Sequence, residues 1–289
     1  MEARFKGKSV LSGMRVAEAM QRAFSWMRPD RGLDSVIRQM IRAKENVVLV
    51  ANQHGQGMGL VSKSDVMAAF YGGLPLGTAC GDIMAGPLVT CLPDMGLDQA
   101  VDIMKDQDIN QIFVADQDSC ITGRISFEDI AGLIYRICRA CKKGLRRHRD
   151  SLPRLVVREV MTGRVTTCQE QDTLVRVMDL LSSQKIRAVP VTDDFGRTCG
   201  VISKTDLVLA YLRGMSVENP ARSVMSGPVV SGTPDQLLSK ALETMLMTDV
   251  QHLFVTMPEN GSICGVVSLS DAVRFRSGTC RACSSSRNF

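Results

Sequence analysis

Aromatic residues, histidines and long apolar runs are all scarce in this sequence of 289 residues. Aromatics make up 4% of the chain, with a single Trp, and there are three His. No apolar run approaches the roughly 20 residues that a membrane-spanning helix needs, and no apolar signal segment follows the charged residues 1–10. We therefore expect a cytoplasmic protein without a membrane span.

A recognisable catalytic constellation is also missing. The histidines His54, His148 and His252 are scattered, and none stands beside a nucleophile or a set of metal ligands. The ten cysteines are too dilute for a disulfide scaffold, and together with seventeen methionines they indicate a reduced, intracellular, helix-rich core. These features predict a protein that is not an enzyme and requires no cofactor.

The composition otherwise is that of a globular protein, with 45% hydrophobic and 22% charged residues. Its length would allow one large core or two ordinary ones. The net charge of +5 is concentrated in one segment, because residues 136–154 contain eight Lys or Arg and one acidic residue. The basic character therefore belongs to this segment and not to the whole surface.

Internal repetition decides the reading of the chain. Four segments carry apolar residues at the i, i+3, i+4, i+7 spacing of an amphipathic helix: Leu33/Val36/Ile37/Met40, Leu97/Ala100/Val101/Met104, Leu174/Val177/Met178/Leu181 and Leu238/Ala241/Leu242/Met245. A Pro-Asp pair ending at Asp30, Asp94 or Asp235 precedes three of them as a predicted helix start, and the third copy has Glu170-Gln171 instead.

Two short β-rich runs, separated by a polar turn, follow each predicted helix. The first runs are Val47–Val50, Ile112–Val114, Val189–Val191 and Leu253–Val255, and the second are Gly59–Ser62, Gly123–Ser126, Gly200–Ser203 and Gly265–Ser268. Three residues after each final Ser stands an Asp, 32, 32, 32 and 33 residues beyond the first Leu of the helix. A Met precedes each of these Leu residues by thirteen positions. The chain therefore consists of four copies of an α-β-β-α unit.

One such unit is too small to cover both faces of its strands, so the copies must pair. The Asp residues are 64 and 65 positions apart in the first and second pair, but 77 apart across the middle. We predict an α/β fold of two double modules, with units at 11–72, 78–135, 155–213 and 219–276, a basic linker at 136–154 and a tail at 277–289. Four units could close a disc within one chain, whereas two associated discs or swapped halves would make a homodimer.

The Gly-apolar-apolar-Ser-x-x-Asp strings, the upstream Met and the run Arg187–Val191 closely resemble the cystathionine-beta-synthase (CBS) domain. The resemblance covers nearly the whole chain and implies two Bateman modules, as in the gamma subunit of AMP-activated protein kinase and stand-alone prokaryotic relatives. It further implies a regulatory ligand, AMP, ADP, ATP or S-adenosylmethionine, held between paired domains. An NAD-binding regulator is a further alternative.

The chemistry of the recurring Ser and Asp suits such a ligand. A carboxylate can accept hydrogen bonds from both hydroxyls of a ribose, and the amides and dipole of a helix start favour a phosphate. The candidate pairs are Ser62 and Asp65, Ser126 and Asp129, Ser203 and Asp206, and Ser268 and Asp271. Lys63 and Lys204 directly after the Ser add positive charge. The same Ser-x-x-Asp pattern is also a variant of the capping box, which needs no ligand.

Further ligand contacts follow from the resemblance. Thr90, Thr167 and Ser231, each seven residues before a helix Leu, lie on the segment that resembles the wall beside the base. Relatives place phosphate contacts where this chain has Asn46, Asn110, Arg187 and Gln251-His252, and Arg187 and His252 favour copies three and four. Copy one has Trp26 at the wall position, and its ring could either stack on an adenine or fill the pocket itself.

Two features fall outside the repeats. Helical spacing continues past Asp129 into the basic linker, which could be a solvated connecting helix or a surface for nucleic acid, an acidic partner or a membrane. The identical pairs Cys138/Cys141 and Cys280/Cys283 have the ligand count of a zinc or iron–sulfur site, although 138 residues lie between them. The remaining cysteines are predicted to be small core residues. The leading hypothesis is a nucleotide sensor that acts through an unknown protein partner.

Overall fold

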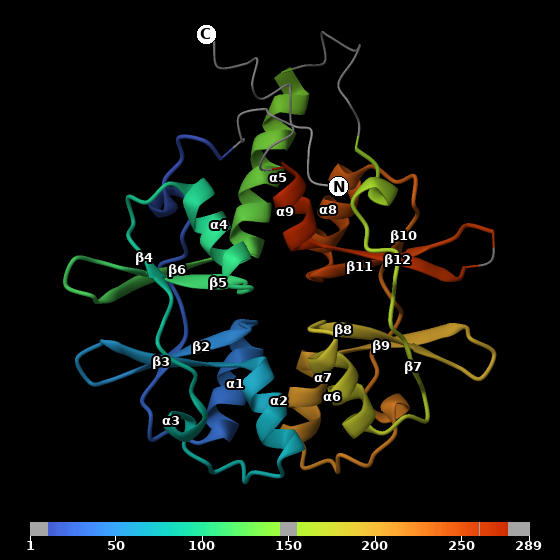
Figure 1. Ribbon diagram of the computed structural model, residues 1–289, viewed down its shortest axis with the longest axis horizontal. Coiled ribbons are helices and arrows are strands. Elements are labelled where there is room, and N and C mark those ends of the chain that lie inside the picture. The colour runs from blue at the N-terminus through green and yellow to red at the C-terminus, as the bar shows by residue number, and fades with distance from the viewer. Residues whose placement is uncertain (1–10, 145–154, 260, 277–289) are drawn as a thin grey trace.

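The computed structural model describes residues 11–144, 155–259 and 261–276, and it contains four three-stranded sheets of the same topology (Figure 1). Repeat one comprises β1 (Trp26–Met27), α1 (Leu33–Ala43), β2 (Val47–Ala51), β3 (Gly57–Ser62) and α2 (Lys63–Tyr71), and repeat two comprises β4 (Thr90–Cys91), α4 (Leu97–Asp106), β5 (Gln111–Ala115), β6 (Ile121–Ser126) and α5 (Phe127–Gly144). Repeat three comprises β7 (Cys168–Gln169), α6 (Leu174–Ser183), β8 (Ala188–Thr192), β9 (Thr198–Ser203) and α7 (Lys204–Leu212). Repeat four comprises β10 (Ser231–Gly232), α8 (Leu238–Met247), β11 (His252–Thr256), β12 (Ile263–Ser268) and α9 (Leu269–Arg276).

The predicted helices and strands are confirmed, and each repeat has one further strand that the sequence pattern did not indicate. The two-residue strands β1, β4, β7 and β10 pair in parallel with the next strand, which pairs antiparallel with the third. A strand of two residues carries no alternation of polar and apolar positions, so periodicity cannot reveal it. Single turns of helix, η1 (Val16–Glu18), α3 (Cys80–Ile83), η3 (Val157–Glu159) and η4 (Ala221–Ser223), precede the four short strands.

The apolar face of each first helix is buried, as the spacing predicts, but the predicted helix starts at Asp30, Asp94 and Asp235 are wrong. The helices begin at Leu33, Leu97, Leu174 and Leu238, and Asp30 and Asp235 instead pair with Arg28 and Arg158. The first amide of each helix donates to a carbonyl of the paired repeat: Leu33 to Thr78 (3.0 Å), Leu97 to Met14 (2.9 Å), Leu174 to Asn219 (3.0 Å) and Leu238 to Leu155 (2.9 Å). Caps supplied from another repeat leave no local sequence signal.

Repeats pair one with two and three with four, through the Met and Gly that recur in the sequence. Ala85, directly after Met84, exchanges two backbone hydrogen bonds with Leu60 on β3, at 2.8 and 2.9 Å. Gln21, Thr162 and Ser226 bridge to β6, β12 and β9 in the same way. A Cβ on Gly59 would lie 2.7 Å from the Ala85 carbonyl and 3.1 Å from Met84 Sδ, and Gly123, Gly200 and Gly265 face the equivalent Met residues. Only Gly permits this close approach of two backbones.

The four repeats surround a common centre, with repeats one and two on one side of the view and repeats three and four on the other (Figure 1). One buried core joins the helices of repeats two and four, and a second joins those of repeats one and three. In the second core Phe70 of α2 stacks on Tyr211 of α7 with ring centroids 5.1 Å apart. A smaller cluster of Leu49, Ala51 and Phe113 joins the sheets of repeats one and two. The predicted α/β fold of two double modules is confirmed, and it closes a disc within one chain.

Helix α5 continues beyond the disc. It runs for 18 residues to Gly144, compared with nine for α2 and α7, which confirms the predicted extension past Asp129 (Figure 1). The linker residues 145–154 and the tail 277–289 lie outside the described residues. No helix among those described is long and apolar enough to cross a membrane. Nucleic-acid binding and homodimer formation remain predictions.

We predict that Gly59→Ala weakens the pairing of repeats one and two. The added Cβ would meet the backbone carbonyl of Ala85, which cannot move without loss of its hydrogen bonds to Leu60. The free energy of unfolding, measured in urea, should fall by about 1–3 kcal/mol. Gly77→Ala is the control, because nothing lies within 4 Å of its added Cβ. Equal stability of the two variants would contradict this account of the pairing.

Candidate functional site

The four recurring Asp side chains cap the helices on which they stand. Asp65 Oδ2 accepts hydrogen bonds from the backbone N–H and the Oγ of Ser62, both at 2.7 Å. The same two contacts are 2.9 and 2.5 Å between Ser126 and Asp129, 2.7 and 2.6 Å between Ser203 and Asp206, and 2.9 and 2.6 Å between Ser268 and Asp271. The Ser hydroxyl thus donates to the carboxylate, and the capping interpretation describes the geometry in every repeat. A single oxygen, Oδ2, makes the cap and holds the carboxylate in place, which leaves Oδ1 as a second acceptor.

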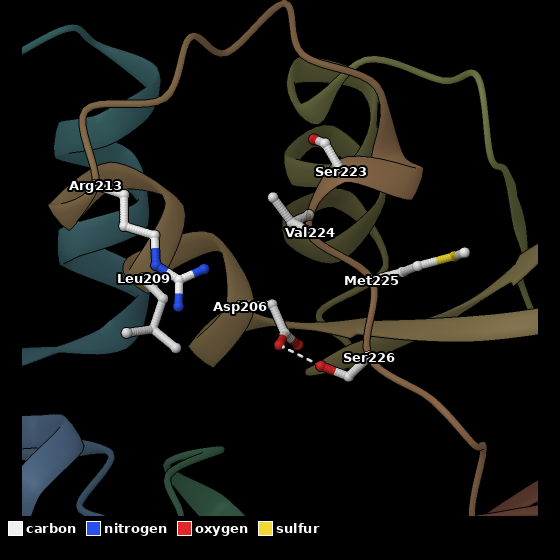
Figure 2. Close-up of a pocket in the computed structure, with 7 residues that line it drawn as sticks. All are labelled: Asp206, Leu209, Arg213, Ser223, Val224, Met225 and Ser226. Atoms are coloured by element: carbon white, nitrogen blue, oxygen red, sulfur yellow. Dashed lines mark hydrogen bonds between the residues drawn. The ribbon is translucent and has the colours of Figure 1, made fainter.

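A cavity of about 260 Å³ opens at Asp206 in repeat three. It lies between α7 and the segment Ser223–Ser226 of repeat four, and Leu209, Arg213, Val224 and Met225 complete its lining (Figure 2). Asp206 Oδ1 accepts a hydrogen bond from Ser226 Oγ at 2.8 Å, and the Arg213 side chain extends from the end of α7 toward Asp206 (Figure 2). The volume is slightly below the roughly 300–1,000 Å³ of typical ligand pockets. One carboxylate, two hydroxyls and one guanidinium therefore face a space shared by two paired repeats.

Repeat two differs, because a guanidinium binds its Asp. Arg124 Nη1 donates to Asp129 Oδ2 at 3.1 Å, and Arg124 Nε donates to Glu45 Oε1 at 3.2 Å. Glu45 is only 7% exposed and also accepts the backbone N–H of Ser25 at 3.0 Å. In repeat two a guanidinium of the protein itself thus binds the carboxylate that is predicted to bind a ribose. The sequence prediction had counted Asp129 among the ligand-binding residues.

The two partners of this ion pair replace aliphatic residues of the other repeats. The positions equivalent to Arg124 hold Leu60, Val201 and Val266, and those equivalent to Glu45 hold Ile109, Ile186 and Val250. Acid and base therefore occur together at two contacting positions in a single pair of repeats. This joint departure was visible in the sequence, although the contact between the two residues was not.

The ion pair yields a prediction about stability. Arg124→Leu leaves the buried Glu45 without its cation and should lower the free energy of unfolding by about 3–5 kcal/mol. The double variant E45I/R124L, which copies the other repeats, should be at least as stable as the wild type because the aliphatic pair needs no desolvation of charge. A double-mutant cycle from urea unfolding measures the coupling. Additive effects of the two single changes would disprove the buried pair.

The starts of α2 and α7 meet at the centre of the disc. Lys63 Nζ donates to Asn46 Oδ1 at 3.0 Å and, across the modules, to Thr205 Oγ1 at 2.9 Å. Lys204 Nζ donates in return to Ser64 Oγ at 2.7 Å. Lys63 is 8% exposed, and burial lowers the pKa of both lysines. The structure thus places two partly desolvated ammonium groups, both predicted as ligand contacts, beside hydroxyl partners.

A second chain of polar contacts brings repeats two, three and four to the same centre. Arg187 Nη1 donates to Gln251 Oε1 at 2.7 Å, and Gln251 Nε2 donates to Glu128 Oε1. Burial lowers the pKa of Arg187 and raises the pKa of Glu128. Glu128 also interacts electrostatically with Lys63, which connects this chain of contacts with the lysines. The sequence interpretation named Arg187 but missed Glu128, because nothing in its local pattern distinguishes it from a surface acid.

His252 stands next to Gln251 at the start of β11. Burial, assisted by the positive charge of Arg187, lowers its pKa to about 4. The imidazole is therefore neutral near pH 7 and can donate only one hydrogen bond.

His252 makes stability depend on pH. The unfolded chain binds a proton below about pH 6.5, whereas the folded imidazole does so only near pH 4. Stability should therefore be lost as pH falls from about 7 to 4, by up to roughly 3 kcal/mol from this group. The change His252→Val, which copies Val47, should flatten this part of the profile of unfolding free energy against pH. Parallel profiles for variant and wild type would show that His252 does not titrate in this way.

The predicted wall beside the base lies at the edge of each sheet. Thr90 and Ser231 are on the short strands β4 and β10, Thr167 directly precedes β7, and all three are exposed. Trp26 occupies the same place on β1 and is 53% exposed, so the alternative that its ring fills the pocket is wrong. Its stacking on a base stays a prediction.

Six cysteines are free thiols: Cys80, Cys91, Cys120, Cys168, Cys199 and Cys264. Cys80, Cys91 and Cys168 are buried, and burial raises the pKa of Cys91 to about 11 and that of Cys168 to about 12. The prediction of core cysteines fails for Cys199, which is exposed. No cluster of three or more metal-ligating side chains occurs within the ranges that the structure describes. The side chains of Cys138 and Cys141, and all of Cys280 and Cys283, lie outside these ranges.

Comparison with known proteins agrees with the repeat architecture. The family model of the CBS domain matches residues 80–136, 157–213 and 221–278, which is more than half of the chain. The protein therefore belongs to the CBS-domain family, and the resemblance seen in the sequence is confirmed. Repeat one lies outside these matches, yet it has the same order of helices and strands as the other three.

One curated relative is also a CBS-domain protein, and two solved structures share the fold of this chain. The CBS domain-containing protein YhcV of Bacillus subtilis is 27% identical over 116 residues, which are 40% of this chain and 81% of YhcV. The crystal structure of a Methanocaldococcus jannaschii protein, proposed to be an archaeal homologue of g-AMPK, has a TM-score of 0.77 at 17% identity and covers 91% of this chain and 99% of its own. An uncharacterised conserved protein of Pyrococcus horikoshii has a TM-score of 0.60 at 17% identity, covering 91% and 100%. These two structural likenesses establish the fold.

Enzymes are also among the relatives, but the matches to them are partial. L-aspartate semialdehyde sulfurtransferase of Methanocaldococcus jannaschii is 26% identical over 130 residues, which are 45% of this chain and 22% of that enzyme. Most of the enzyme therefore lies outside the match.

Proposed function

We propose that this protein is a regulatory sensor that binds adenine nucleotides, AMP, ADP or ATP, in crevices between its paired CBS repeats and acts through a protein partner. The observation that carries the proposal is the convergence of Lys63, Lys204 and Arg187 at the centre of the disc, beside helix starts that carry fixed carboxylates. A nucleotide needs both kinds of group, because its sugar offers hydroxyl donors and its phosphates carry negative charge.

The sugar end of the ligand is assigned to the capping carboxylates. In repeats one, three and four the Asp is held by its Ser through Oδ2, so its position is fixed before any ligand arrives. In repeat three Asp206 lines the cavity, and its Oδ1 already accepts a hydrogen bond from the hydroxyl of Ser226. A ribose hydroxyl would replace Ser226 as the donor. This exchange conserves the number of hydrogen bonds.

The phosphate end is assigned to the centre. Lys63, Lys204 and Arg187 are partly desolvated and have neutral hydrogen-bond partners, so an incoming anion would offer them stronger, charge-assisted hydrogen bonds. His252 beside them is neutral and has one N–H to offer. This excess of positive charge favours phosphate-bearing ligands over S-adenosylmethionine, whose sulfonium is cationic. NAD carries phosphates as well and is therefore part of the test below.

The crevices are not equivalent. Arg124 neutralises the Asp129 carboxylate of repeat two through Oδ2, so we assign ligand binding to repeats one, three and four, with repeat three first because Asp206 lines a cavity. The regulatory action follows from the two cores that span both modules, because a ligand that changes the centre changes how repeat one packs on three and two on four. A partner that binds the disc would detect this change.

Calorimetric titration with AMP, ADP, ATP, S-adenosylmethionine and NAD tests the proposal. We expect at least one adenine nucleotide to bind more tightly than S-adenosylmethionine. Asp206→Asn should weaken this binding roughly tenfold, because the amide oxygen takes the cap and the atom that faces the ribose changes from a carboxylate oxygen to an NH2 donor. Asn can still accept the Ser203 hydrogen bonds, so the helix cap is retained.

Asp271→Asn tests repeat four in the same way, and Asp129→Asn serves as the comparison in which Arg124 already occupies the carboxylate. Urea unfolding of each variant separates loss of ligand from loss of fold. The proposal fails if no adenosine compound binds the intact protein.

A further inference from the structure

Glu128 gives the centre of the disc an acid that the other repeats lack. It is the second residue of α5, and the equivalent positions in repeats one, three and four hold Ser64, Thr205 and Ser270. The preceding position differs as well, because Phe127 stands where repeats one and three have Lys63 and Lys204. Repeat two therefore contributes negative charge to the centre, where repeats one and three contribute positive charge.

The contacts of Glu128 show which cations it serves. Its Oε1 accepts the hydrogen bond from Gln251 Nε2, and the same amide accepts from Arg187 through Oε1 at 2.7 Å. Among the acidic residues, Glu128 has the strongest electrostatic interaction with both Lys63 and Arg187. One carboxylate thus offsets part of the charge of two cations that come from repeats one and three.

From this arrangement we infer that Glu128 is a specificity-determining residue of the nucleotide site: a resident anion that competes with ligand phosphate for Lys63 and Arg187 and so disfavours ligands with more phosphate charge. The inference rests on the proposed function for the identity of the ligand. The repulsion between Glu128 and a bound anion does not depend on that function. Like charges within several ångströms of one another repel strongly in a partly buried site. Each added phosphate is therefore repelled by Glu128, and this repulsion lowers the binding affinity that Lys63 and Arg187 alone would give.

The closing experiment compares wild type with Glu128→Gln by calorimetric titration at constant ionic strength. Gln can still accept the Gln251 hydrogen bond, so only the charge is removed. We expect Glu128→Gln to bind inorganic pyrophosphate roughly tenfold more tightly than wild type does, because a like-charge repulsion disappears. The gain should increase from adenosine, where it is absent, through AMP to ATP.

Two further variants control the result. Asp179→Asn removes one negative charge from the exposed side of α6 and should leave pyrophosphate affinity within twofold of wild type. Ser64→Glu introduces a second acid at the equivalent position of α2 and should weaken pyrophosphate binding roughly tenfold. Because Ser64→Glu should change pyrophosphate affinity in the opposite direction, it tests the inference even if Glu128→Gln folds poorly.

The outcomes separate this inference from the proposed function. If pyrophosphate responds to both changes as expected while no adenosine compound binds, the resident anion is supported and the nucleotide proposal fails. If AMP binds wild type and Glu128→Gln equally, and pyrophosphate does so too, Glu128 has no such role and the nucleotide proposal stands. Failure of pyrophosphate to bind any of the variants would overturn the inference.

Discussion

The close approach of two backbones at a glycine is the constraint on which this structure depends. Gly59, Gly123, Gly200 and Gly265 let the segment after a Met of the paired repeat bond to the edge of each sheet. The carbonyls that cap the first helices lie six residues before the same Met residues. Each repeat of a pair therefore needs hydrogen-bond partners for its backbone from the other repeat. Pairing also places the start of a helix, with its Asp carboxylate, against the segment of the neighbouring repeat that contains this Met. The cavity at Asp206 results from this pairing, because the segment Ser223–Ser226, which contains Met225, forms one side of it.

Much of this fold follows from the sequence, because its main determinants are periodic. The buried faces of the first helices, the long strands and the pairing of repeats all leave regular marks in the chain, and each was predicted. The starts of the first helices were wrong for a physical reason. Leu97 is capped by Met14 and Leu33 by Thr78, and such contacts over long sequence distances do not require particular residue types. The short strands escaped for a similar reason, since two residues carry no period.

In the candidate site, too, the residues could be predicted from the sequence but their contacts could not. The Ser and Asp pairs and the lysines could be named because repetition aligns them, whereas Arg187 and His252 were named from the resemblance to the CBS domain. Their interactions could not be predicted, because these depend on how four repeats meet. Arg124 contacts Asp129 within repeat two and Glu45 of the paired repeat one, and Glu128 contacts Gln251 of the other module. Repeat two has thus diverged at two separate points while its backbone has stayed like that of its neighbours. Divergence of charge within a conserved framework converts four equal crevices into unequal ones.

The two helical cores have a consequence for the history of the chain. Each core takes helices from both modules, so a single module would expose the apolar faces of four helices to water. A protein of half this length could cover those faces only with a second copy of itself. Joining two such halves in one polypeptide makes the association independent of protein concentration. It also frees the halves to differ in sequence, so that unequal residues such as Phe127 and Lys204 can occupy equivalent positions of different repeats.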